Sequence, residues 1–103
     1  MCGIVGFLLK RPYEKAYEEL FCATDALSHR GPNGRGVYVD RKNGVGLGHT
    51  RLSILDLSHL ARQPMATEDE SSWIVYNGEI YNFRELRGYL ISKGFSFRTK
   101  SDT

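Results

Sequence analysis

The sequence predicts an α+β domain, in which several strands combine with two helices. Residues 3–9 form an apolar run rich in β-branched and aromatic side chains, which is typical of a buried strand. Residues 37–40 and 45–50 read as two strands joined through Lys42-Asn43-Gly44, a good hairpin signal. Apolar residues also recur at helical spacing in two other stretches, residues 13–27 and 83–90.

The first helix is predicted between the opening strand and the hairpin. Lys10-Arg11-Pro12 stops the strand, and Pro12 suits the first turn of a helix because its fixed φ is already helical. The helix should end near Gly31, where residues 28–34 form a turn-rich loop. Its apolar face consists of residues spaced three or four apart: Tyr13, Tyr17, Leu20, Thr24 and Leu27.

Less regular structure is predicted after the hairpin. Residues 52–57 could extend the sheet, whereas residues 58–71 are polar and irregular. Residues 73–76 are a further strand candidate, rich in aromatic and β-branched side chains.

A second helix is predicted after Asn82. Asn82 with Glu85 three residues later resembles a capping box, and Gly94 suits the position that closes a helix. Its apolar stripe consists of Phe83, Leu86 and Leu90. Residues 95–98 should form a short last strand. Residues 101–103 have the composition of a helix start, yet no helix follows, so the chain is expected to be part of a longer protein.

Composition narrows the function classes. One hundred and three residues with 41% apolar and 25% charged content fit one small globular domain. A net charge of +2 gives no case for a nucleic-acid or membrane surface, and no signal peptide or membrane-length apolar run is present. Two cysteines do not make a disulfide framework, which favours a reducing, cytoplasmic setting; Cys22 is predicted to pack in the core.

Cys2 stands one removable residue from the amino terminus. After cleavage of Met1 it would carry a thiol and a free α-amine on the same residue, and so supply both a nucleophile and a base. The alternative is a chance cysteine before an ordinary strand.

Three other positions are candidates for chemistry, each with a structural alternative. Arg51 could hold a carboxylate through paired hydrogen bonds, or be a surface arginine. The Asn77 side chain and the Gly78 backbone N–H could form an oxyanion hole, or Asn-Gly could be a hairpin turn. Asp102 could accept hydrogen bonds from a substrate ammonium group, or cap a helix.

Two further features give weaker indications of a catalytic or binding site. Residues 29–32 (HRGP) form a loop that is either structural or a flap. The histidines, His29, His49 and His59, match no common ligand spacing, so no metal site is expected. No phosphate-binding or dinucleotide-binding glycine motif is present.

Several blocks of the chain, in order, resemble the class II glutamine amidotransferases, and most of all the glutaminase domain of glutamine-hydrolysing asparagine synthetases. The blocks are residues 1–6 (MCGIVG), 29–32 (HRGP), 48–54 (GHTRLSI), 63–65 (QPM) and 76–82 (YNGEIYN). The family often has aspartate where this chain has Asn33, which puts the contacts of that loop in doubt.

The resemblance implies an N-terminal nucleophile hydrolase with an αββα sandwich, of which residues 1–103 would form only the N-terminal half. It implies that Cys2 is the nucleophile and that Asn77 and Gly78 form the oxyanion hole. The residues implied in substrate binding are Arg51, Leu52, Ile54, Glu79 and Asp102. An incomplete sandwich would leave strand edges and apolar faces exposed, and a homodimer is one way to cover them.

The implied activity is the glutaminase half-reaction, which converts L-glutamine to glutamate and ammonia without a cofactor. ATP and Mg²⁺ are expected only in a synthetase domain or chain, which this sequence lacks. Two alternatives stay open: a non-catalytic, truncated paralogue that acts as an interaction or regulatory domain, and an amidotransferase of the same class with another ammonia acceptor.

Overall fold

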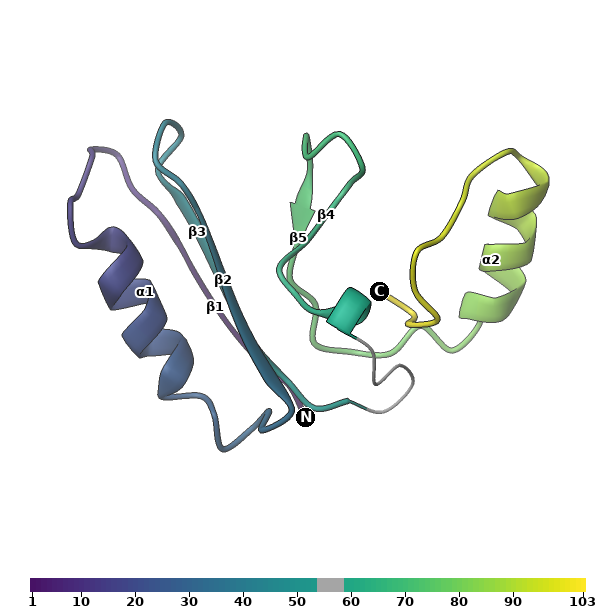
Figure 1. Cartoon of the computed structure of the whole chain (residues 1–103), viewed down its shortest axis with the longest axis horizontal. Helices are drawn as coiled ribbons and strands as arrows, with labels where there is room; N and C mark the ends of the chain where they lie inside the picture. Colours follow the sequence, from purple (N-terminus) through teal and green to yellow (C-terminus); the bar gives the residue numbers. More distant parts are fainter. Residues whose placement is uncertain (54–58) are drawn as a thin grey trace.

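The computed structural model describes residues 1–53 and 59–103, and it has an α+β architecture in two parts that diverge from a common base (Figure 1). One part is a three-stranded antiparallel sheet covered by helix α1 (Ala16–Asp25). The other contains a small two-stranded sheet and helix α2 (Phe83–Ser92). The predicted fold class is confirmed at this level.

Strand β3 (Val45–Arg51) is the centre of the larger sheet. It pairs with β1 (Gly3–Leu8) on one side and with β2 (Gly34–Asp40) on the other, in the order β1-β3-β2. The predicted β2–β3 hairpin is confirmed, and it closes through Gly44, whose φ of +68° favours glycine. The Leu9 N–H donates to the Gly44 carbonyl at 2.7 Å, so β1 ends beside the same turn.

Helix α1 buries one face against this sheet. Leu20 and Thr24 from the predicted face are fully buried, Ala16 is buried beside them, and the Thr24 hydroxyl donates to the Leu20 carbonyl. The helix begins at Ala16 rather than at Pro12, and Tyr17 is exposed. The prediction that Cys22 packs in the core is wrong, because residue 22 lies on the opposite side of the helix from Leu20 and Thr24.

Exposed and less exposed residues alternate along β1, so the prediction of a buried strand is wrong. Ile4 is 48% exposed and Leu8 is 77% exposed, whereas Gly3 is buried. Helix α1 covers one face of the sheet only, and β1 is an edge strand. The apolar residues that point away from α1 therefore remain at the surface.

The second part begins at His59, where the described chain resumes after Ser53. A short 3₁₀ turn (His59–Ala61) and strand β4 (Met65–Ala66) lie in the stretch predicted to be irregular. Strand β5 (Trp73–Ile74) is shorter than predicted and pairs with β4 in antiparallel fashion. The Trp73 ring stacks on Tyr38 of β2 with 3.8 Å between centroids, which joins the two parts.

Helix α2 confirms the second helix prediction but not its details. Asn82 makes no side-chain capping bond, so the predicted capping box is absent. Gly94 closes the helix as predicted, with a φ of +94°. No residue of α2 is buried, and the apolar stripe at Leu86 faces solvent.

Residues 95–98 form no strand, contrary to prediction, and the Arg98 side chain rather than the backbone of this stretch donates to the Ala66 carbonyl of β4. The chain runs back along α2 instead. The Arg87 guanidinium donates to the carbonyls of Thr99 and Ser101, at 2.7 and 3.1 Å, and lies over the Phe97 ring. These contacts bring residues 101–103 back to the middle of the molecule (Figure 1).

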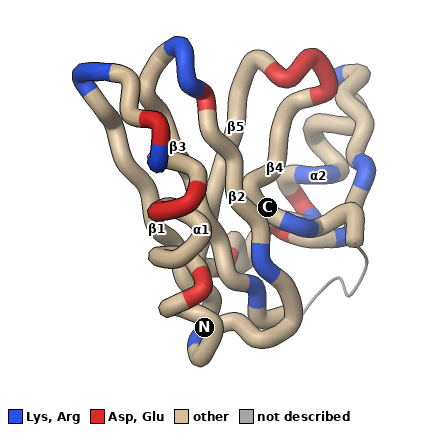
Figure 2. The backbone as a smooth tube through the Cα atoms, turned by 60° about the vertical axis from the view of Figure 1, so that its left-hand side comes forward, with Lys and Arg blue, Asp and Glu red and all other residues tan. Residues whose placement is uncertain are grey.

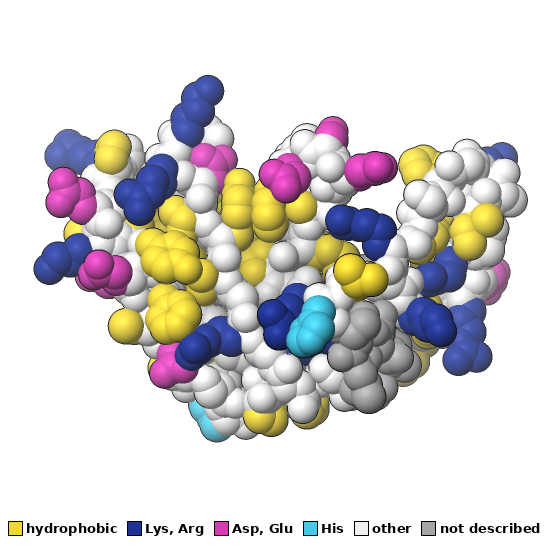
Figure 3. All heavy atoms as spheres, in the orientation of Figure 1, with side chains coloured by type: hydrophobic (Ala, Val, Ile, Leu, Met, Phe, Trp, Pro, Cys, Tyr) yellow, Lys and Arg dark blue, Asp and Glu magenta, His cyan; other side chains and the backbone are white. Residues whose placement is uncertain are grey.

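Lysines and arginines alternate with aspartates and glutamates along both parts of the described chain (Figure 2). Hydrophobic side chains also reach the surface, among them several on the side of α1 (Figure 3). Within residues 1–53 and 59–103, neither helix has the length and apolar character needed to cross a bilayer.

Gly31 makes the closest backbone approach in the loop after α1, and its replacement should destabilise the fold. A Cβ at Gly31 would lie 2.4 Å from the Thr50 carbonyl carbon and 2.5 Å from the Arg51 nitrogen, both backbone atoms of β3. We expect Gly31→Ala to lower the free energy of unfolding by about 1–3 kcal/mol in urea denaturation. Gly88→Ala is the matched control. It has open space in exposed helix α2, so it should gain about 0.5–1 kcal/mol. Equal stability of Gly31→Ala and the wild type would contradict the packing.

Candidate active site

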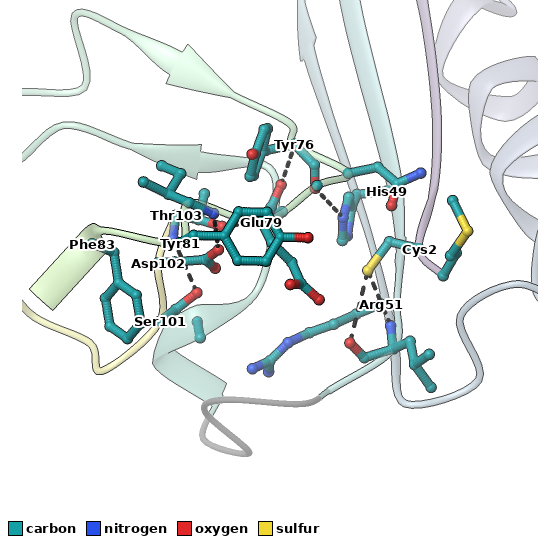
Figure 4. A pocket seen from close by; sticks show the side chains of 17 residues that line it. Cys2, His49, Arg51, Tyr76, Glu79, Tyr81, Phe83, Ser101, Asp102 and Thr103 are labelled. Carbon is teal, nitrogen blue, oxygen red and sulfur yellow. Dashed lines mark hydrogen bonds between the residues drawn. The ribbon is translucent and has the colours of Figure 1, made fainter.

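A cavity of about 560 Å³ lies where the two parts of the molecule meet (Figure 4). Its walls come from the start of the chain and the end of β3, from the 3₁₀ turn and Gln63 after it, from the stretch after β5, and from the last residues of the described chain. The predicted site residues that line it are Cys2, Arg51, Leu52, Asn77, Gly78, Glu79 and Asp102. Ile54, the remaining predicted site residue, lies outside the described residues.

Cys2 is held at the start of β1 by backbone contacts. The next residue, Gly3, pairs with Thr50 and donates its N–H to the Thr50 hydroxyl at 3.1 Å. The Cys2 Sγ accepts a hydrogen bond from the Leu52 backbone N–H, 3.3 Å away. The Arg30 guanidinium donates to the Cys2 carbonyl at 3.2 Å. The sulfur therefore has a defined position at the cavity wall.

Arg51 ends strand β3 and is only 9% exposed, so the surface-arginine alternative does not hold. Side chains alternate along a strand, and Thr50 faces α1, where its hydroxyl donates to the Leu27 carbonyl. Arg51 and His49 therefore lie on the other face, toward the cavity (Figure 4). A buried guanidinium at this wall is suited to binding a carboxylate.

Asn77 and Gly78 follow β5, and residues 79–103 form no strand that could pair with it, so the hairpin alternative is wrong. Two buried side chains hold the residue before them. The His49 Nε2–H donates to the Tyr76 carbonyl at 3.2 Å, and the Tyr76 N–H donates to Gln63 Oε1 at 2.5 Å. Asn77 and Gly78 thus line the same cavity as Cys2 and Arg51.

Asp102 enters the cavity from the far end of the chain. Its Oδ2 accepts a hydrogen bond from the Ile80 backbone N–H at 2.8 Å, and no described helix begins there for it to cap. Glu79, beside Ile80, is exposed and also lines the cavity. Two carboxylates at this wall are suited to binding an ammonium group.

The loop at residues 29–32 is tied to β3, which favours its structural interpretation. Gly31 is buried against Thr50 and Arg51, and Pro32 forms a bridge with Arg51. Asn33 uses its side-chain oxygen to accept the Ser53 N–H at 3.0 Å. An aspartate could accept the same bond, so this contact is compatible with either residue.

His49 and Gln63 are the site residues that sequence reasoning missed. Both are buried polar side chains, 1% and 8% exposed. His49 stands two residues before Arg51, and this strand alternation was the available signal for its direction toward the site. No local sequence pattern predicted the contacts of Gln63, because its partners, Tyr76 and Thr103, are 13 and 40 positions away in the sequence.

His49 should make stability depend on pH. Burial lowers its pKa below the usual value for histidine, and the Arg51 charge adds to this, against the opposing effect of the bond to Tyr76. The unfolded chain therefore binds a proton that the folded chain resists. We expect the thermal midpoint to fall as pH drops from 7.5 through about 6.5 toward 5.5, and His49→Gln to fall less steeply. Parallel pH curves for the two proteins would contradict this.

Comparison with known proteins identifies the family. A family model described as the glutamine amidotransferase domain matches residues 1–103. Asparagine synthetase [glutamine-hydrolyzing] 1 of Bacillus subtilis (strain 168) is 45% identical over 106 residues, covering 100% of this chain and 16% of the relative. Putative asparagine synthetase [glutamine-hydrolyzing] 2 of Methanocaldococcus jannaschii is 39% identical, covering 100% and 22%.

A relative with a different name is the amidase chry2 of Gibberella zeae, which is 37% identical over 99% of this chain and 16% of its own length. The chain thus spans about a fifth or less of the length of these relatives. The match of the family model over all 103 residues, together with these identities, decides the assignment: this chain belongs to the class II glutamine amidotransferase family.

Proposed function

We propose that this chain performs the glutaminase half-reaction of an amidotransferase, in which the side-chain amide of L-glutamine is hydrolysed to glutamate and ammonia. One observation carries the proposal. Cys2, Arg51 and the Asn77–Gly78 pair come from separate segments and line one cavity. A nucleophile, a carboxylate-binding cation and oxyanion donors are the groups that this hydrolysis needs.

The amino-acid end of glutamine is held first in this mechanism. Arg51 binds the α-carboxylate, and Asp102 and Glu79 accept hydrogen bonds from the α-ammonium group. Leu52 and Ile54 complete the substrate contacts on the segment after β3. Binding at this end leaves the side-chain amide directed at Cys2.

The chemistry then proceeds through a thioester. The Cys2 α-amine, directly or through a water, takes the thiol proton, and the thiolate adds to the amide carbon. Asn77 and Gly78 donate to the oxyanion of the tetrahedral intermediate. The C–N bond breaks and ammonia leaves with the proton, which gives a glutamyl thioester. Water hydrolyses this thioester, releasing glutamate and restoring the thiol.

Two requirements follow. Met1 must be removed, because it holds the Cys2 nitrogen in a peptide bond. The half-reaction requires no cofactor, whereas use of the ammonia requires a synthetase domain or chain, where ATP and Mg²⁺ would act. We place the domain in the N-terminal nucleophile hydrolase class, as the N-terminal part of its αββα sandwich, and expect it in the cytoplasm, where free cysteines such as Cys2 and Cys22 stay reduced.

The ammonia acceptor is a separate matter. The synthetase relatives favour aspartate as the acceptor of the complete system. A second candidate is an amidotransferase with another acceptor, which the relatives named amidases favour. Both candidates share the glutaminase step, so the same experiment tests this step for both.

Covalent labelling tests the proposal within one chain. An electrophilic glutamine analogue should modify Cys2 once Met1 is removed, because the cavity presents the analogue to its sulfur. Cys22 is the internal control, since it is exposed on α1 and does not line the cavity. Mass spectrometry should locate the label on Cys2 alone, and excess glutamine should prevent it.

A general alkylating agent should modify both cysteines in the same preparation. Equal labelling of Cys2 and Cys22 by the glutamine analogue, or labelling that glutamine does not slow, would contradict a glutamine site. Retention of Met1 together with labelling of neither cysteine would favour the non-catalytic alternative.

A further inference from the structure

The backbone carbonyl and the backbone N–H of Tyr76 each form a hydrogen bond with a buried side chain. Its carbonyl accepts from His49 Nε2, and its N–H donates to Gln63 Oε1 (Figure 4 shows the His49 contact). Backbone groups in irregular segments usually bond to water or to neighbouring backbone. Here, two side chains from distant parts of the sequence bind one residue, which directly precedes Asn77. We call this arrangement of His49, Gln63 and the Tyr76 backbone the Tyr76 clamp.

Both side chains of the clamp are buried and make contacts beyond Tyr76. His49 belongs to β3, the central strand, and is 1% exposed. Gln63 uses the other end of its amide to donate to the Thr103 hydroxyl at 3.2 Å. Its amide therefore connects the Tyr76 backbone with the residue after Asp102, so that two walls of the cavity share one side chain.

The hydrogen-bond partners assign the His49 tautomer. The Tyr76 carbonyl can only accept, so Nε2 carries the proton. His49 Nδ1 is buried and has no partner within the described part of the chain, so a proton on that atom would be unpaired. The ring is thus a neutral donor, and its role toward Tyr76 is to hold the carbonyl.

We propose that His49 and Gln63 are positioning residues that fix the Asn77–Gly78 oxyanion donors relative to Cys2, an inference that rests on the proposed glutaminase function. The connection is short. His49 lies on β3, which pairs through Gly3↔Thr50 with β1, the strand that directly follows Cys2. Tyr76 is bonded covalently to Asn77. Oxyanion donors act only when they are held at hydrogen-bond distance from the developing charge, and a displacement of about 1 Å can cost about 100-fold in rate.

Paired substitutions test the clamp. His49→Leu keeps the bulk and removes the donor, whereas His49→Gln keeps an N–H near the position of Nε2. We expect His49→Leu to lower kcat for glutamate release by about tenfold to 100-fold, with KM within about twofold. His49→Gln should recover most of the loss, and Gln63→Met should resemble His49→Leu. His59→Leu is the control, because His59 is exposed and does not line the cavity.

A kcat loss in His49→Leu that His49→Gln does not restore, or a change confined to KM, would overturn the inference. Amide hydrogen exchange of Tyr76, whose N–H donates to Gln63 Oε1, provides a readout that needs no turnover. Exchange at Tyr76 should accelerate in His49→Leu, which leaves Gln63 intact, while exchange in β2 stays unchanged. Unaltered exchange at Tyr76 in His49→Leu would refute the clamp even if the chain hydrolyses no glutamine, whereas an absence of glutaminase activity in the wild type, with accelerated exchange in the variant, would refute the proposed function alone.

Discussion

Replacement of Cys2 by alanine is expected to abolish the release of glutamate from glutamine. In the proposed mechanism the Cys2 sulfur forms the covalent intermediate, and no other described side chain in the cavity is a thiol. Removal of a catalytic nucleophile lowers turnover by several orders of magnitude, so we expect a loss of at least about 1,000-fold. A coupled assay for glutamate measures it directly.

Binding and folding should survive this substitution. Arg51 and Asp102 remain in Cys2→Ala, so glutamine should still raise the thermal midpoint of the variant. Cys22→Ala is the matched control and should keep wild-type turnover, because Cys22 is exposed on α1. Glutamate release that is unchanged in Cys2→Ala would rule out the thioester mechanism.

Asn77→Ala is expected to have the second largest effect. Its side-chain amide is proposed to donate to the oxyanion, a charge that exists only in the intermediate and its transition states. The loss of one such donor typically costs about 100- to 1,000-fold in kcat. KM should stay within about threefold of the wild type, since the proposed ground-state contacts are to the amino-acid end of glutamine.

The control for this prediction is Asn82→Ala. Asn82 is exposed and makes no side-chain capping bond at the start of α2, so its removal should leave kcat unchanged. Steady-state kinetics of the two variants show whether a loss of kcat is specific to the Asn77 amide or follows the removal of any asparagine in this region. An Asn77→Ala enzyme with wild-type kcat and a raised KM would place Asn77 in substrate binding instead.

Local sequence signals predicted the elements that depend on near neighbours. The β2–β3 hairpin formed at Gly44, and α2 ended at Gly94, because a positive φ is available to glycine at little cost. Helix α1 was predicted from the spacing that buries Leu20 and Thr24. The strand at residues 95–98 and the capping box at Asn82 were wrong, because a strand requires a partner edge and a cap requires a particular side-chain rotamer.

The candidate site was likewise predicted only in part from the sequence. Motif resemblance selected Cys2, Arg51 and Asn77–Gly78, and these residues do line one cavity. Local pattern did not separate the alternatives for Arg51 and Asn77. Arg51 became a buried cavity residue through the pairing of β3, and Asn77 was kept out of a hairpin by the absence of a strand after it.

The sequence by itself determined the chemistry that this chain can offer: a cysteine next to a removable methionine, an arginine, an asparagine–glycine pair and the family to which they belong. Only the tertiary structure decided how these groups are held. His49 and Gln63 bind the Tyr76 backbone across 27 and 13 positions, and Asp102 meets Ile80 across 22. Such contacts depend on the path of the whole chain, because a hydrogen bond requires two atoms at about 3 Å, and local sequence carries no information on that separation.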